Sequence, residues 1–199
     1  MNNMSFFWQT ILVEGGLAVV AILVDGLFRL RLHYWEHCWC NLETLRQITW
    51  GLLPLIAGYF VLQTLPFAAL RKIDSVVRVL FWQHMGHWKL WQLALVAALA
   101  GFGEELLFRG LIQLGLSTFL NVWIAVLLTS LVFGLAHAVT PTYCLLAFVI
   151  SLYLGFLFIH TGNLVVPMAV HALYDFFVFL YIRFTPQVTY GSIIPTGTR

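Results

Sequence analysis

Three charged residues that could take part in chemistry lie in the middle of apolar sequence. Residues 101–110 read GFGEELLFRG, which places Glu104, Glu105 and Arg109 between long apolar runs. A charge at the centre of a bilayer costs roughly 2.5–3.5 kcal/mol on insertion scales, so charges retained there are functional candidates. Glu105 and Arg109 are four residues apart and can pair along one helix face. This pairing explains Arg109 structurally and leaves Glu104 free to face another group.

Two histidines follow on later apolar segments. His137 comes four residues after Phe133, and His171 comes four residues before Asp175. An aspartate one turn from a histidine can hold the ring in one tautomer and orientation. We therefore expect Glu104, His137 and His171 to meet in one water-containing cavity.

Such a cluster has the groups needed to hydrolyse a peptide bond without a serine or cysteine nucleophile. A carboxylate in an apolar cavity is a stronger base than in water and can take a proton from a water molecule. One histidine can pass that proton to the leaving amine, and the other can donate to the oxyanion, worth about 3 kcal/mol. Alternatively, Glu104, His137 and His171 could ligate zinc with water in the fourth position. The HExxH motif of zinc peptidases is absent, so no metal ligand is assigned from a motif.

The composition is that of a membrane protein. Of the 199 residues, 61% are hydrophobic and 9% are charged, with a mean hydropathy of +0.92, whereas soluble domains carry about a quarter charged residues. Several apolar runs reach the roughly 20 residues that span a bilayer as a helix, and they are continuous rather than alternating. A net charge of +2 gives no indication of a nucleic-acid partner.

The apolar runs predict a polytopic all-α bundle of about six transmembrane helices. Their approximate bounds are 6–28, 47–70, 88–116, 119–138, 142–160 and 163–183. Gly101 and Gly103 predict a break in the third helix, with a new helix starting at the glutamates. Breaker residues at 140–142 and 161–163 predict turns. Residues 71–82 have the pattern of a helix lying in the membrane interface, or else form a basic loop.

Three motifs, EELLFR (104–109), FGLAH (133–137) and HALYD (171–175), occur in this order on successive apolar segments. They resemble the CPBP family of intramembrane proteases, whose pattern is EExxxR, FxxxH and Hxxx(N/D). The family includes the type II CAAX prenyl endoproteases and the bacteriocin-processing or immunity proteins, also called Abi. The resemblance covers roughly residues 88–183, about half of the chain.

The resemblance implies an organisation and a location. Transmembrane helices and the interfacial helix occupy residues 1–87, a four-helix catalytic core occupies residues 88–183, and a C-terminal tail occupies residues 184–199. The protein would cross a prokaryotic plasma membrane several times. Its partners would be the lipid bilayer and a membrane-associated protein or peptide substrate, cleaved in the C-terminal region of a membrane-anchored or lipidated chain.

The resemblance also implies roles for the motif residues. Glu104 and His137 would activate water, and His171 would form the oxyanion site. The residues with a supporting structural role would be Glu105, Arg109 and Phe133. Position 175 is Asp, where the prenyl endoproteases are described with Asn. Because an ionised Asp accepts hydrogen bonds but cannot donate to an oxyanion, we assign Asp175 to orienting His171.

Other readings of the same residues stay open at this point. The fold could serve a non-catalytic bacteriocin-immunity or peptide-binding protein, or His137 and His171 could be axial ligands of a heme. A transporter is disfavoured because no inverted repeat is visible. Glu14 is interpreted as a packing or snorkelling residue. The loop HYWEHCWC (33–40) offers His33, His37, Cys38 and Cys40 as soft-metal ligands, although their spacing matches no standard zinc module.

Overall fold

The protein is built of helices, with no strand, in the residues that its structure, a computed structural model, describes: 3–28, 30 and 32–185. The elements are α1 (Asn3–Phe28), the short 3-10 helix η1 (Tyr34–His37), α2 (Leu42–Thr64), α3 (Ala68–His84), α4 (Leu90–Glu105), the π-helix η2 (Leu106–Gln113), α5 (Leu114–Ser117), α6 (Val122–Ala136), α7 (Pro141–Thr161) and α8 (Val165–Phe184). This confirms the all-α bundle. The predicted boundary at residues 87–88 falls between α3 and α4. The tail predicted for residues 184–199 lies, from residue 186, outside the described residues.

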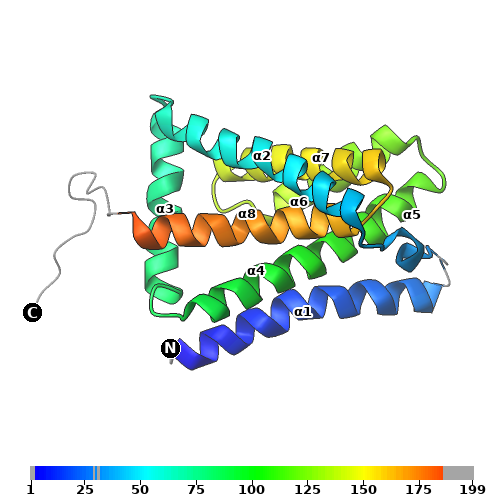
Figure 1. The fold of residues 1–199 in the computed structure, drawn as a ribbon, viewed down its shortest axis with the longest axis horizontal. Helices are drawn as coiled ribbons and strands as arrows, with labels where there is room; N and C mark the ends of the chain where they lie inside the picture. Colours follow the sequence, from blue (N-terminus) through cyan, green and yellow to red (C-terminus); the bar gives the residue numbers. More distant parts are fainter. Residues whose placement is uncertain (1–2, 29, 31, 186–199) are drawn as a thin grey trace, which may run out of the picture.

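The long helices run side by side, and α3 lies across one end of them (Figure 1). Helix α4 packs between α1 and α8, α2 packs on the other side of α8, and α6 pairs with α7. Within the described part of the chain, α1, α2, α7 and α8 are long and apolar enough to cross a membrane, and α6 is a shorter apolar helix. Large apolar side chains such as Leu12 and Leu27 are more than 70% exposed on the outside of the bundle, as a lipid-facing surface requires.

The break predicted at Gly101 and Gly103 is wrong. Helix α4 continues through both glycines to Glu105, and the irregular stretch comes afterwards, as the π-helix η2. A Cβ atom at Gly101 would lie 2.6 Å from the carbonyl oxygen of Met168 in α8, and one at Gly103 would overlap the carbonyl oxygen of Glu14 in α1. The glycines therefore let neighbouring helices approach closely, which is how membrane helices commonly pack.

The predicted turns at 140–142 and 161–163 are confirmed. Thr140 caps α7 by accepting a hydrogen bond from the backbone N–H of Tyr143 (3.1 Å), and Pro141 occupies the first turn, where its missing N–H costs least. Helix α7 ends at Gly162, whose φ of 64° is left-handed. The first of these turns follows directly on His137, which therefore sits at the end of α6.

The helix predicted over residues 71–82 is confirmed as α3, and it extends from Ala68 to His84. Within it, Arg78 forms an ion pair with Asp74 (Nε–Oδ2, 2.8 Å) and donates to Thr185 Oγ1 at 3.0 Å. The second contact ties α3 to the end of α8. Helix α3 crosses the end of the bundle (Figure 1), where its Phe81 belongs to one apolar cluster with Leu93 of α4 and Ile182 of α8.

Candidate active site

The site is built on a fully buried ion pair between adjacent turns of one helix. Arg109 Nη1 donates to Glu105 Oε1 at 2.8 Å, and neither side chain is exposed. Arg109 Nη2 also donates to the backbone oxygen (2.7 Å) and the hydroxyl (2.8 Å) of Ser151 in α7. A buried ion pair offsets its desolvation only when its geometry is good and its other polar atoms are satisfied. Here Arg109 Nε and Glu105 Oε2 have no hydrogen-bond partner among the described residues. The pairing of Glu105 with Arg109 is confirmed, and the hydrogen bonds from Arg109 to Ser151 join η2 to α7.

The same glutamate holds the second histidine of the site. His171 Nδ1 lies 2.9 Å from Glu105 Oε1, and His171 Nε2 lies 3.5 Å from Asp175 Oδ2. The sequence predicted Asp175 as the partner that orients His171, and the structure adds Glu105, which is closer and belongs to another helix. Residue spacing reveals partners along one helix but gives no signal for this contact between helices. A ring that faces a carboxylate at each nitrogen can donate from both.

The hydrogen bond of His137 to the main chain sets its tautomer. Its Nδ1 lies 2.8 Å from the carbonyl oxygen of Phe133. Because a carbonyl oxygen can only accept, Nδ1 carries the proton and the neutral ring keeps Nε2 as an acceptor. The Phe133 ring stacks on the imidazole, with centroids 4.3 Å apart and planes 20° apart. The centroid of the Phe133 ring also lies 5.3 Å from the guanidinium carbon of Arg109, which is a cation–π contact.

Glu104 and His137 face each other across a short gap. Glu104 Oε2 lies 3.8 Å from His137 Nε2, which is longer than a hydrogen bond but suited to a bridging water molecule. Glu104 Oε2 is buried and has no hydrogen-bond partner among the described residues. The His137 side chain is 28% exposed. The gap thus holds two unused acceptors, and it is accessible from the side of His137.

A further carboxylate, Glu14 of α1, belongs to the same neighbourhood. It interacts electrostatically with Asp175 and His171, and also with Glu104. Glu14 Oε2 is buried and lacks a hydrogen-bond partner in the part of the chain that the structure describes. The sequence analysis interpreted Glu14 as packing or snorkelling and so missed this position. The available signal was an acidic residue in the middle of an apolar segment.

A metal-bound histidine presents one ring nitrogen to the metal and usually donates from the other to a carboxylate or carbonyl group. His171 Nδ1 faces Glu105 at 2.9 Å, so only Nε2, 3.5 Å from Asp175, is left for a zinc ion or a heme iron. Across residues 3–28, 30 and 32–185 there is no group of three His, Cys, Asp or Glu residues placed to hold a metal ion, which includes the described part of the loop 33–40.

Comparison with known proteins identifies the segment that carries the three motifs. Residues 86–177 match the family model described as type II CAAX prenyl endopeptidase Rce1-like. The match covers a little under half of the chain, and it supports the CPBP/CAAX protease family expected from the motifs. Helices α1, α2 and α3 lie outside it. Searches of curated proteins and of solved structures returned no match.

Proposed function

We propose that this integral membrane protein hydrolyses a peptide bond with a water molecule activated by Glu104 and His137. The match of residues 86–177 to the Rce1-like family of type II CAAX prenyl endopeptidases supports this reaction class. The observation that carries the proposal is the 3.8 Å gap between Glu104 Oε2 and His137 Nε2. Two acceptors at this separation can hold one water molecule by both of its hydrogens. The lone pairs of its oxygen then remain free to attack.

In the first step the water oxygen bonds to the carbonyl carbon of the cleaved bond while Glu104 takes the proton. The carboxylate is suited to this role because its Oε2 is buried and has no hydrogen bond to a described residue that would compete for the lone pair. A positioned general base contributes about 10²–10⁴-fold to a rate. His137 holds the second hydrogen of the water, so that the attacking oxygen is aimed by two contacts.

In the second step the negative charge on the former carbonyl oxygen must be stabilised. His171 Nε2–H can turn from Asp175, which is 3.5 Å away, to that oxygen, while Glu105 keeps hold of Nδ1 at 2.9 Å. A preorganised donor of this kind is worth roughly 10²–10³-fold. The proton held by Glu104 then passes to the amide nitrogen, the carbon–nitrogen bond breaks, and a carboxylic acid and an amine leave.

The proposed substrate is a membrane-associated protein cut in its C-terminal region next to a membrane anchor or lipid group. This follows from the name of the matched family and from a site built on buried residues of an apolar bundle. We place the protein in a prokaryotic plasma membrane, with several crossings.

The experiment is peptide hydrolysis by the purified protein in liposomes, with products identified by mass spectrometry. In ¹⁸O-labelled water the new carboxyl terminus should gain the label. Glu104→Gln and His137→Gln should each lower the rate at least about a hundredfold. The matched control is Glu43→Gln, an exposed glutamate paired with Arg46, which should leave the rate unchanged. Full hydrolysis by both site variants would reject the proposal, and a peptide-binding or immunity role without catalysis would take its place.

A further inference from the structure

Tyr143 places a phenol beside the candidate active site. Its ring centroid lies 6.5 Å from that of His137, and the two ring planes are tilted by 48°. Residues 137–140 connect α6 to α7, and Thr140 Oγ1 accepts from the backbone N–H of Tyr143 at 3.1 Å. The short turn that places His137 at the end of α6 therefore also fixes Tyr143 in the first turn of α7.

The hydroxyl of Tyr143 has no hydrogen-bond partner among the described residues, although two carboxylates lie near it. Tyr143 interacts electrostatically with Asp175 and with Glu104. Neither carboxylate accepts a hydrogen bond from the phenol in this structure. Because a phenol donates one hydrogen bond, the site contains a donor that no described residue uses.

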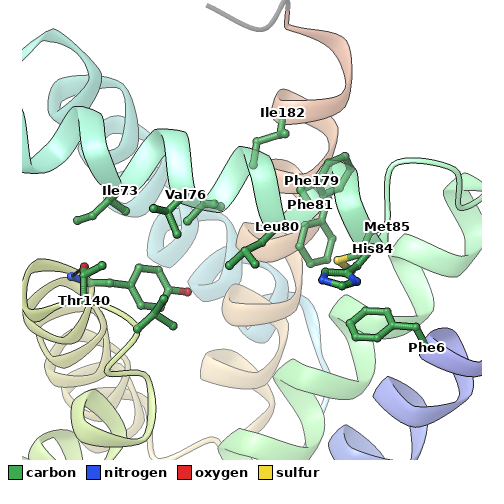
Figure 2. Close-up of a pocket in the computed structure, with 13 residues that line it drawn as sticks. Phe6, Ile73, Val76, Leu80, Phe81, His84, Met85, Thr140, Phe179 and Ile182 are labelled. Carbon is green, nitrogen blue, oxygen red and sulfur yellow. Dashed lines mark hydrogen bonds between the residues drawn. The ribbon is translucent and has the colours of Figure 1, made fainter. Parts of the chain in front are cut away.

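The other side of Tyr143 faces a cavity of about 400 Å³ that offers this hydroxyl no charged partner. Figure 2 shows Ile73 and Val76 of α3 on one wall of the cavity and Thr140 on the other. The lining is apolar except for His84, Thr140 and Tyr143. His84 lies at the end of the cavity away from Thr140 (Figure 2). The ionisable groups nearest to the phenol are therefore those of the active site.

The proposed hydrolysis has a place for a second donor at the oxyanion. His171 Nε2 supplies one hydrogen bond, whereas an ionised Asp175 only accepts. Preorganised oxyanion sites commonly direct several donors at the developing charge. Tyr174 also interacts electrostatically with Asp175, but its other such partners are tyrosines. Tyr143 interacts with Glu104 as well, which places its phenol closer to the activated water.

We propose that the Tyr143 hydroxyl is a second oxyanion donor, which acts together with His171 Nε2. The inference rests on the proposed peptidase function and adds a catalytic residue to it. When the water oxygen bonds to the carbonyl carbon, the electron pair of the carbonyl π bond moves to the oxygen. The Tyr143 O–H donates to that oxygen and keeps its own proton. When the carbon–nitrogen bond breaks, the carbonyl group forms again and this hydrogen bond weakens.

The kinetic signature follows from the timing of the charge. The oxygen carries more negative charge in the transition state than in the bound substrate, so the contact raises kcat more than it strengthens substrate binding. In liposomes, Tyr143→Phe should therefore lower kcat about 10²-fold with little change in KM. The unfolding midpoint should stay the same, because the deleted hydroxyl has no hydrogen-bond partner among the described residues.

Two matched variants separate this role from a general effect of losing a phenol. Tyr153, on the same helix, donates to the backbone oxygen of Gly51 at 2.8 Å. Tyr153→Phe should lower the unfolding midpoint by a few degrees and leave kcat unchanged. Tyr174→Phe should also keep kcat. A loss of kcat in Tyr174→Phe with none in Tyr143→Phe would overturn the inference.

A binding measurement tests the same contact without turnover. A phosphonate analogue of the peptide carries a tetrahedral, negatively charged group in place of the cleaved bond, and its affinity is measured by calorimetry in EDTA, so that no metal ion holds it. Tyr143→Phe should weaken phosphonate binding by about 10²-fold. Added to Glu104→Gln, it should leave the affinity for the uncleaved peptide unchanged.

The outcomes distinguish this inference from the proposed function. Equal weakening of the phosphonate and the peptide would overturn the oxyanion role of Tyr143. Full hydrolysis by Tyr143→Phe, with Glu104→Gln inactive, would also overturn it and would leave the proposed peptidase intact. Absence of hydrolysis by the wild type would instead reject the peptidase itself, and the oxyanion role with it.

Discussion

The adjacent glutamates Glu104 and Glu105 should respond in opposite ways to the same substitution. Glu105 Oε1 accepts from both Arg109 (2.8 Å) and His171 (2.9 Å), and all of Glu105 is buried. Glu105→Gln removes the charge that balances a guanidinium with no exposure to solvent. Breaking a buried pair by removing one partner costs about 3–5 kcal/mol. At about 2–4 °C per kcal/mol for a chain of this size, the midpoint of thermal unfolding should fall by roughly 6–20 °C.

Glu104→Gln should behave differently, because Glu104 Oε2 has no hydrogen-bond partner among the described residues to lose. Neutralising a buried carboxylate without a partner removes a desolvation penalty, so the unfolding midpoint should stay the same or rise. Hydrolysis, by contrast, should fall at least about a hundredfold, because the amide cannot accept the water proton. Glu105→Gln should therefore lower the unfolding midpoint, whereas Glu104→Gln should lower the rate of hydrolysis without lowering the midpoint.

The assay follows the fluorescence of the eight tryptophans while the detergent-solubilised protein is heated, and compares both variants with the wild type. Hydrolysis is measured on the same preparations. The reasoning is refuted if Glu104→Gln lowers the midpoint as much as Glu105→Gln does. It is also refuted if Glu105→Gln leaves the midpoint unchanged, since Arg109 would then have no need of its buried partner.

Three more predictions concern α1 and the metal question. Glu14→Gln should lower kcat without lowering the unfolding midpoint, because its buried Oε2 has no partner among the described residues and acts on the site through charge; an unchanged kcat would remove it from the site. Gly103→Ala should destabilise the protein by about 1–3 kcal/mol in thermal unfolding, because its Cβ would overlap the Glu14 carbonyl oxygen. Gly115→Ala, whose Cβ would meet only Leu32 at 3.9 Å, is its control, and equal midpoints for the two would contradict the close packing. Dialysis against EDTA or 1,10-phenanthroline should leave hydrolysis intact, and a loss restored by added zinc would show that a metal takes part.

Hydrophobic pattern and breaker residues were enough to predict the helices and most of the turns. A long apolar run in lipid must satisfy its backbone hydrogen bonds internally, which a helix does. The helices α1, α2, α6, α7 and α8 accordingly lie near their expected positions. The helical spacing of Glu105 and Arg109 likewise predicted a pair that the structure confirms. Such predictions succeed because they depend only on neighbours along one helix.

The role of Gly101 and Gly103 was mispredicted because it depends on other helices. As isolated residues they indicate a break in a helix. In the bundle, Gly101 lies at the close contact of α4 with α8, and Gly103 lies at the close contact of α4 with α1. The π-helix after Glu105 had no sequence signal, since a π-helix is defined by a change of hydrogen-bond register rather than by residue type.

The sequence by itself determined that this chain is a helical membrane protein and which residue types are available for chemistry, because hydropathy and spacing along a helix are local properties. Only the tertiary structure decided that Glu105 rather than Asp175 is the closer partner of His171, and that Glu14 joins the site from α1. The same is true of the gap between Glu104 and His137. These contacts join different helices, and their geometry depends on how closely the glycines of α4 allow those helices to pack.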